Sequence, residues 1–228
     1  MTISPLLQCH ITPSGSILTP RGRGWFVAIA KKFKKRDAKP DDDGAYIMTL
    51  VLPPNADIST IKEAVKKKAQ EKWGADMPGN LKLPYKKCKD VFNDKGYKKY
   101  PPELDECYQL TANTYKQQPG IADAKGNNIG VLLQGENNDE RQQRIEKECY
   151  SGRHYRMTVQ PSVFNNESRG VKLYLQNIQL LDYGDVIGGR TADAEDDFTP
   201  VEGMPDAAGT AAVAASVAPA ASADSLFD

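Results

Sequence analysis

Alternating hydrophobic and polar positions predict an antiparallel hairpin over residues 150–184, two strands joined by a loop of Asn, Glu, Ser, Arg and Gly. The hydrophobic side of this hairpin consists of alternate residues in both strands, namely Tyr155, Met157, Val159, Val171, Leu173 and Leu175. The opposite side is polar, cationic and partly aromatic, with His154, Arg156, Thr158, Gln160, Lys172, Tyr174 and Gln176. One side of the sheet therefore suits a core and the other a ligand. The alternation slips near Asn177, where we expect a β-bulge.

Further segments have the pattern of strands. Residues 24–33 have a hydrophobic centre flanked by cations, and residues 45–52 form a buried strand that a pair of prolines ends. Residues 107–115 alternate and place on their polar side Gln109, Thr111, Asn113 and Tyr115. A short strand is expected near residues 129–133, and the short apolar runs of residues 3–19 suit one or two short strands or an edge hairpin. With the hairpin of residues 150–184, these segments predict a largely antiparallel sheet.

Two segments have helical periodicity and recognisable ends. The first begins at Asp57 or Ser59, carries one apolar stripe, and ends at Gly74. Its lysines lie largely off that stripe, on a solvated face or on a basic binding surface. The second helix is capped by Asn137 or Asn138, and its acidic first turn complements the helix dipole. One helix is therefore expected after the first long hairpin and the other directly before the last.

Residues 75–106 show no period, and a segment of this length without regular structure is usually disordered or functional. Tyrosines and lysines are interspersed along it: Tyr85, Lys86, Lys87, Lys95, Tyr97, Lys98, Lys99 and Tyr100. Lysines meet phosphates and tyrosine rings stack on bases, so the composition favours contact with nucleic acid. The alternative is a solvated loop that is packed by its own tyrosines.

Charge is distributed unevenly along a chain whose formal net charge is zero. Residues 191–228 contain eight acidic residues and no Lys or Arg, which leaves 30 basic and 22 acidic residues in residues 1–190. A body of about +8 suits a polyanion, and an acidic tail can mimic one. The tail is rich in small residues and Pro, so we expect it to be disordered. We therefore divide the chain into a binding domain, residues 1–190, and a flexible tail, residues 191–228.

Four widely spaced cysteines, Cys9, Cys88, Cys107 and Cys149, include no CxxC pair. Reduced thiols in a cytosolic protein explain this spacing better than a zinc site or a disulfide. The N-terminus lacks a basic region followed by an apolar run, and no apolar segment of 18 residues occurs. We expect a cytoplasmic protein that makes no membrane contact and needs no metal or other cofactor.

These elements predict a mainly β (α+β) fold, and the pattern alone fits a small Greek-key barrel or a sandwich. The segments WFVAIAKKF, AYIMTLVLPPNADISTIKEAV, PPELDECYQLTANTYKQQPGI and 149–189 resemble a family of phage-encoded single-stranded-DNA-binding proteins. The shared features are a strand ending in paired prolines before a helix, a Tyr-Ser-Gly start of the last hairpin, and its closing residues, here Leu175, Asn177, Ile178 and Gln179. The likeness covers roughly residues 20–190. It implies an oligonucleotide/oligosaccharide-binding (OB) fold: an antiparallel Greek-key barrel with two inserted helices and a disordered C-terminal tail.

The resemblance also implies a function, the cooperative or weakly sequence-selective covering of single strands during phage replication and recombination. Proteins of this kind often end in an acidic tail tipped by Phe, which docks replication and repair partners and competes with DNA. The tip of this chain is similar, although its Phe is penultimate: Asp224, Leu226, Phe227 and Asp228. We therefore expect single-stranded DNA as the main partner, replication or recombination proteins at the tail, and the host cytoplasm as the location. The oligomeric state stays open, with a homo-oligomer among the alternatives.

The predicted interface joins cations for phosphates with aromatic rings for bases. Phosphate contacts are assigned to Lys34, Lys35, Lys86, Lys87, Arg156 and Lys172. Stacking is assigned to Tyr85, Tyr97, Tyr115 and Tyr174. His154 suits either role.

Two other functions share part of this pattern. A strand-annealing protein of the recombination machinery has every feature used above. A metal-dependent nuclease needs clustered carboxylates, and the candidates lie in loops without the motifs of such sites: Asp41, Asp42, Asp43, Glu103, Asp105 and Glu106. The chain also lacks a phosphate-cradling Gly-Lys-Ser/Thr loop and a motif around a catalytic serine. We expect binding without catalysis.

Overall fold

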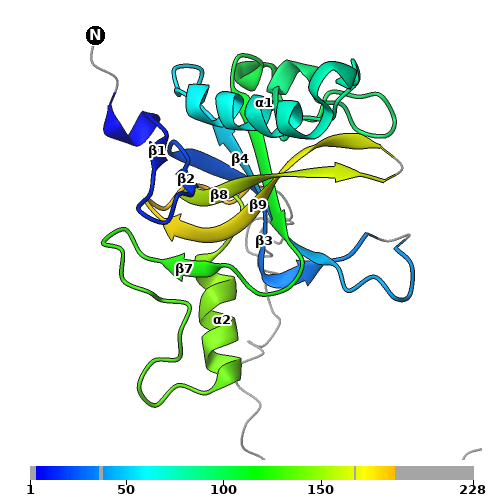
Figure 1. The fold of residues 1–228 in the computed structure, drawn as a ribbon. Coiled ribbons are helices and arrows are strands. Elements are labelled where there is room, and N and C mark those ends of the chain that lie inside the picture. Colours follow the sequence, from blue (N-terminus) through cyan, green and yellow to red (C-terminus); the bar gives the residue numbers. More distant parts are fainter. Residues whose placement is uncertain (1–3, 36–37, 167, 188–228) are drawn as a thin grey trace, which may run out of the picture. The chain divides into compact units, whose positions relative to one another are not determined.

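A ring of five strands forms the centre of the structure, a computed structural model that describes residues 4–35, 38–166 and 168–187 (Figure 1). The strands are β3 (Gly22–Phe33), β4 (Ala45–Leu52), β6 (Tyr108–Thr114), β8 (His154–Asn165) and β9 (Arg169–Leu180). Hydrogen bonds join them in the order β3, β4, β6, β9, β8 and back to β3. The sheet therefore closes on itself, and the fold is mainly β with α-helices, as predicted.

The strands β6 and β9 are parallel neighbours, whereas the other four pairs of the ring are antiparallel. The sheet is therefore largely antiparallel, as predicted, and this parallel pair is the exception within the ring. Between β6 and β9 the chain forms a helix and then β8, from which β9 turns back as the second arm of a hairpin. This long connection allows β9 to return beside β6 in the same direction, which a short turn cannot do.

Short elements flank the ring. β1 (His10–Ile11) and β2 (Ile17–Leu18) form an edge hairpin, one of the two alternatives for residues 3–19, and β2 pairs with β8. β5 (Tyr85–Lys87) pairs with β6, and β7 (Gly120–Ala122) runs parallel to β9. Single turns of 3₁₀ helix are found at η1 (Pro5–Leu7), η2 (Gly74–Asp76), η3 (Cys88–Asp90) and η4 (Pro102–Leu104).

The prediction of a strand near residues 129–133 is wrong, because these described residues form a loop. Arg144 donates from Nη1 to the carbonyl of Ile129 at 2.6 Å and from Nη2 to that of Val131 at 3.0 Å. The guanidinium thus occupies carbonyls that a neighbouring strand would otherwise use. A run of apolar residues does not reveal such a contact with a distant side chain.

The hairpin of β8 and β9 has the predicted two sides. All six residues of its predicted hydrophobic side are buried. Thr158 pairs with Asn177 and Val159 pairs with Leu175, so Gln176 has no partner in the ladder. This is the expected β-bulge, and it turns the rest of β9 so that Ile178 and Leu180 also lie in the core.

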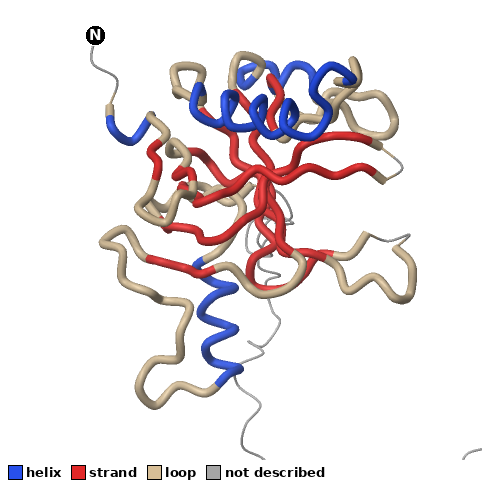
Figure 2. Tube along the Cα trace, viewed as in Figure 1, coloured by secondary structure: helices blue, strands red, loops and turns tan. Residues whose placement is uncertain are grey.

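Two α-helices lie at opposite ends of the ring (Figures 1 and 2). α1 (Ser59–Trp73) buries Ile61, Val65 and Ala69, begins where Asp57 accepts the amide of Ser59, and ends at Gly74, whose φ is +52°. α2 (Asn138–Glu148) packs against β3 and buries Ile145. Its cap is Asn137, which forms a capping box with Glu140. Both helices lie where the sequence predicts them, and Asn137 and Gly74 mark the expected ends; the N-cap of α1, however, is Ile58 rather than Asp57 or Ser59.

The four cysteines are free thiols, and Cys88, Cys107 and Cys149 are buried. Cys88 and Cys107 belong to a second hydrophobic cluster with Val51 and Tyr100 on the outside of the ring. The described residues contain no helix that is long and apolar enough to cross a membrane. The predicted tail, 191–228, lies outside the described residues, as do its tip residues Asp224, Leu226, Phe227 and Asp228.

Candidate nucleic-acid interface

The outer face of β6 and β9 carries residues that the sequence assigned to DNA. Ala112 and Leu173 are register partners in the core, and the next pair along the strands is Asn113 and Tyr174. Because successive side chains of a strand point to opposite faces, Asn113 and Tyr174 face outward. The polar and aromatic face that the alternation predicted thus exists on these two strands.

Lys172 lies over the ring of Tyr115, with its Nζ 4.7 Å from the ring centroid. This is a cation–π contact on the same outer face. The Tyr115 side chain is about half exposed (48%), and Asn113 Nδ2 donates to its hydroxyl at 3.4 Å. A positive charge and an accessible aromatic ring therefore lie side by side, as contact with a phosphate and a base of the same strand requires.

A polar hollow of about 270 Å³ continues this face beyond Tyr174. Its lining consists of Thr114, Gln117, Gln118, Pro119, Tyr174, Leu175, Gln176 and Asn177. The Gln118 amide has a fixed orientation, since its Nε2 donates to the carbonyl of Ile29 at 2.9 Å and its Oε1 accepts from Arg141 Nη2 at 2.8 Å. The hollow thus offers polar groups next to the aromatic and cationic pair.

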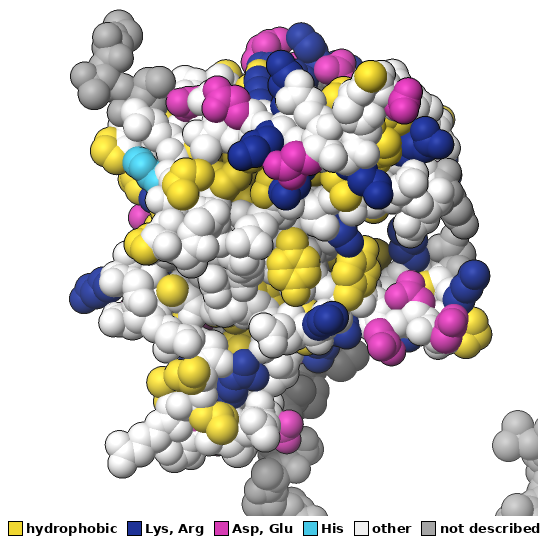
Figure 3. Space-filling view, in the orientation of Figure 1, with side chains coloured by type: hydrophobic (Ala, Val, Ile, Leu, Met, Phe, Trp, Pro, Cys, Tyr) yellow, Lys and Arg dark blue, Asp and Glu magenta, His cyan; other side chains and the backbone are white. Residues whose placement is uncertain are grey.

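The tips of two hairpins flank this face and add cations. Lys34 and Lys35 are exposed in the loop between β3 and β4. Arg169 begins β9 at the other tip, where its carbonyl accepts the amide of Lys82 at 3.0 Å. Both tips point to the same side of the ring in Figure 1. Figure 3 shows hydrophobic side chains, in yellow, beside Lys and Arg, in dark blue, on the surface between them.

The Tyr/Lys-rich segment, residues 75–106, is held against the outer face of the ring by one of its tyrosines. Tyr100 is buried, its ring lies 4.8 Å from that of Trp25, and its hydroxyl donates to Gln109 Oε1 at 2.6 Å. Tyr97 is 68% exposed in the same segment. Part of the segment is therefore packed by its own tyrosine, while Tyr97 has a ring available for a ligand.

The strand β5 sends its three predicted site residues in different directions. Tyr85 packs against the core, and this burial raises the pKa of its hydroxyl. Lys86 is exposed. The Nζ of Lys87 lies 4.2 Å from the ring centroid of Tyr108 and donates to the carbonyl of Glu106 at 2.6 Å. Lys86 alone among the three is exposed without such a contact, so it is the one that suits the interface.

Arg156 is buried because the N-terminal segment crosses the outside of β8. Its Nε donates to the carbonyl of Thr19 at 2.8 Å, and its Nη2 donates to that of Gln8 at 3.2 Å. Burial lowers the pKa of the guanidinium. Because these donors are committed to the backbone, the geometry does not support the phosphate contact assigned to Arg156.

His154 lines a different cavity, of about 430 Å³, together with Arg21, Arg23 and Trp25. Burial, followed by the positive charge of Arg21, lowers the pKa of its imidazole. This shift favours the neutral ring, which suits a phosphate contact poorly. His154 shares the alternation of Lys172 but not its surroundings.

Lys82 and Arg169 are cations of this region that sequence reasoning missed. They line a polar hollow of about 310 Å³ with Ser168 at the tip of the β8–β9 hairpin. Lys82 reaches the hairpin through a backbone bridge to Gly170. No local pattern links two segments so far apart in the chain. The presence of Arg169 in the loop of the hairpin was, however, a signal in the sequence for a cation at this tip.

Two of the acidic residues considered for a nuclease site, Asp105 and Glu106, form ion pairs with lysines. Asp105 pairs with Lys98 at 2.8 Å, and Glu106 pairs with Lys87 at 3.3 Å and with Lys89 at 3.1 Å. In the part of the chain that the structure describes, no three His, Cys, Asp or Glu side chains gather as a metal site requires. These carboxylates therefore serve as partners for the basic segment.

A small closed barrel with a cationic, aromatic outer face is typical of barrels that bind single-stranded nucleic acid. The comparison with protein families defines the group more narrowly. Residues 27–208 match the family described as the single-stranded-DNA-binding protein of Enterobacter phage Enc34. This match spans more than half of the chain, and the chain belongs to that family, which confirms the resemblance seen in the sequence.

Solved structures show the same fold at low sequence identity. The single-stranded DNA-binding protein from bacteriophage Enc34 in complex with single-stranded DNA is 15% identical, with a TM-score of 0.61 over 79% of this chain and 93% of that chain. A second structure of the single-stranded DNA-binding protein from bacteriophage Enc34 is 14% identical, with a TM-score of 0.58 over 83% of this chain and 93% of that chain. No curated protein sequence matches the chain significantly.

Proposed function

We propose that this protein binds single-stranded DNA with little sequence specificity and covers it during phage replication and recombination, without catalysis. One observation carries the proposal: the Lys172 ammonium over the exposed ring of Tyr115, beside Tyr174 on the outer face of β6 and β9. Family membership supports it, and so does the similar fold of a protein described in complex with single-stranded DNA.

We also infer that the ring is an OB-type Greek-key barrel. Taken in chain order, its strands pair in the order first, second, third, fifth, fourth, and back to the first. OB barrels have five strands and bind oligonucleotides on the face of the second and third. These are β4 and β6 here, and the proposed face includes β6.

Two interactions contribute to the proposed binding, electrostatic contacts with phosphates and stacking on bases. Lysines and arginines at the hairpin tips neutralise phosphates and release counterions, so affinity falls as salt rises. Exposed rings stack on bases at roughly 1 to 3 kcal/mol each, which every base can satisfy because every base has a π-face. The proposed contacts are Lys34, Lys35, Lys82, Lys86, Tyr97, Tyr115, Arg169, Lys172 and Tyr174. Both interactions are indifferent to sequence, in agreement with a covering role.

The acidic tail is proposed, from its charge and composition, to compete with DNA for the basic body or to dock replication or recombination proteins. The tail has eight acidic residues and no Lys or Arg, and the body has a net charge of about +8, so the tail and the body attract each other electrostatically. A chain ending at Gly189 removes these charges and leaves the described strands intact.

The test is a titration of fluorescent oligo-dT and of duplex DNA at several salt concentrations, with the full chain and with the form ending at Gly189. We expect a preference for oligo-dT and an affinity that falls with salt. Equal affinity for duplex DNA, or no salt dependence, would contradict the proposal. If the tail competes with DNA, the shorter form binds more tightly; unchanged affinity would leave only the docking role.

A further inference from the structure

Three consecutive hydrophobic side chains lie in water on the loop before α2. Val131, Leu132 and Leu133 are 49%, 50% and 50% exposed. Figure 3 shows yellow side chains grouped at the lower end of the molecule, where Figure 1 places the loop between β7 and α2. Single exposed apolar residues are common on proteins, but a contiguous group usually marks an interaction site.

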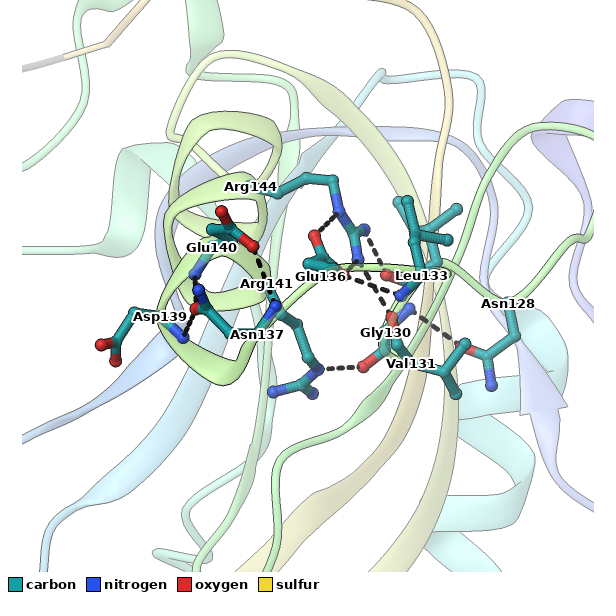
Figure 4. Close-up of polar contacts among 11 residues, drawn as sticks. Asn128, Gly130, Val131, Leu133, Glu136, Asn137, Asp139, Glu140, Arg141 and Arg144 are labelled. Atoms are coloured by element: carbon teal, nitrogen blue, oxygen red, sulfur yellow. Dashed lines mark hydrogen bonds and ion pairs between the residues drawn. The ribbon is translucent and has the colours of Figure 1, made fainter.

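The loop is held in one shape by two arginines and a glutamate (Figure 4). Arg144 donates to the carbonyl of Val131, as described above, and its Nε donates to Glu136 Oε1 at 2.7 Å. Glu136 Oε2 accepts the amide of Leu133 at 2.9 Å, and Arg141 donates to the carbonyl of Gly130. A loop that is already ordered loses little conformational entropy when it binds a partner.

An apolar groove lies at the other end of the ring, between α1 and residues 77–83. Its volume is about 620 Å³, and its apolar lining includes Val65, Ala69, Met77, Leu81 and Leu83. Met77 and Leu83 are 40% and 39% exposed on the open side of the groove. The groove can therefore take up aliphatic side chains from outside.

The charges around the loop and the groove are of opposite sign. Lys62 and Lys66 line the groove, with Glu63 as the acidic residue among the lining side chains. Asp139 and Glu140 lie exposed in the first turn of α2, directly after the loop. Arg144 is paired with Glu136, whereas Arg141 contacts only neutral groups and keeps its positive charge. With Asp139 and Glu140 these charges sum to −1 at the loop, against +1 at the groove.

We propose that residues 131–133 of one copy bind the α1 groove of a second copy, head to tail. The two surfaces differ and lie at opposite ends of the ring (Figures 1 and 2). After one contact forms, each copy retains one unused surface. The association therefore produces rings or open filaments rather than a closed dimer. The idea that such a filament follows a DNA strand rests on the proposed function. The contact between copies does not depend on that function.

The test is sedimentation velocity of the full chain without DNA, over a range of concentrations at low salt. We expect wild type to form species larger than a dimer as concentration rises. Leu132→Glu removes the loop surface and Met77→Glu removes the groove, so each variant alone stays monomeric. An equimolar mixture retains one intact loop and one intact groove, and therefore forms dimers and nothing larger. Ile11→Glu, at a 61% exposed site on β1, is the matched control and assembles like wild type.

Three results would overturn the proposal: wild type that stays monomeric, a Leu132→Glu variant that assembles like wild type, or a mixture that forms no dimer. A second measurement separates this inference from the proposed function. On an oligo-dT that holds one copy, both variants bind as tightly as wild type, whereas cooperative binding to long poly-dT is lost. Failure of wild type to bind the short oligonucleotide would contradict the proposed function and leave the sedimentation result standing.

Discussion

The aromatic ring of Tyr115 gives the interface its most direct test at the scale of one residue. Tyr115→Leu keeps an apolar side chain and removes the stacking face. We expect affinity for a short oligo-dT to fall by about 1 to 3 kcal/mol, roughly 5- to 150-fold, measured by fluorescence anisotropy. The fold should be unaffected, because the ring is half exposed at the end of β6.

Tyr183 provides the matched control for Tyr115. It is also exposed (68%), and its ring also faces a cation, the guanidinium of Arg153 at 4.1 Å. Tyr183→Leu therefore removes a similar pair outside the proposed interface and should leave affinity unchanged. Equal losses in the two variants would mean that the face of β6 and β9 has no special role.

A substitution of Arg156 tests whether this residue stabilises the fold rather than contacting DNA. Arg156→Met removes the donors to the carbonyls of Thr19 and Gln8 while keeping much of the apolar stem. Leaving buried acceptors without a donor costs about 1 to 3 kcal/mol. We expect urea denaturation to show that loss of stability, and the folded variant to bind a short oligo-dT as wild type does. A stable variant with weak DNA binding would restore the phosphate role that the sequence first suggested.

At the scale of elements, the loop before α2 depends on an ionised carboxylate. The hydrogen bond from Arg144 holds the pKa of Glu136 at about 2. A glutamate in the unfolded chain has a pKa near 4.3, so its contribution to stability is complete above that pH and is lost as the pH falls toward about 2. The free energy of unfolding of wild type minus that of Glu136→Gln should thus be constant above about pH 5 and shrink below about pH 4.

Urea denaturation between pH 3 and pH 8 measures this difference. Glu103→Gln is the control, because Glu103 is exposed and makes no ion pair among the described residues. It should change stability little, and equally, at every pH. A Glu136→Gln difference that stayed constant down to pH 3 would show that the ionised Glu136 does not stabilise the loop.

The chain predicts its elements well where the cause is local. Asn137 and Gly74 mark helix ends because capping involves only the next few residues. The bulge beside Asn177 follows from the slip in alternation, since a two-residue period must be broken to keep Ile178 inside. The apolar run of residues 129–133 predicts a strand, but these residues form a loop. The arginine that holds their carbonyls comes from the following helix, so the local pattern does not reveal it.

At the scale of the molecule, the number of phosphate contacts sets the salt dependence of binding. Each phosphate contacted on a single strand adds about 0.7 to the slope of log affinity against log salt. Replacing Lys34 and Lys35 together by Gln should make the slope shallower by about 1.4 if both meet phosphates. The titration is made on a short oligo-dT so that contacts between copies do not contribute.

The exposed lysines Lys125 and Lys147 form the control pair for this measurement. Their replacement by Gln removes the same charge from the β7 loop and from the end of α2, away from the proposed face. The slope should then stay that of wild type. If both double variants changed the slope alike, the overall charge of the body rather than the hairpin tip would determine binding.

The sequence by itself determined the two-sided strands, both helices, the free cysteines, the charge imbalance and the resemblance to a family, because each depends on neighbours in the chain or on composition. Only the tertiary structure decided which outward residues stay accessible. His154, Arg156, Lys172 and Tyr174 share one alternation, yet the N-terminal segment covers Arg156 while the parallel pairing of β6 and β9 joins Lys172 to Tyr115. A period of two fixes the face of a strand, but the contacts of that face come from segments far away in the chain.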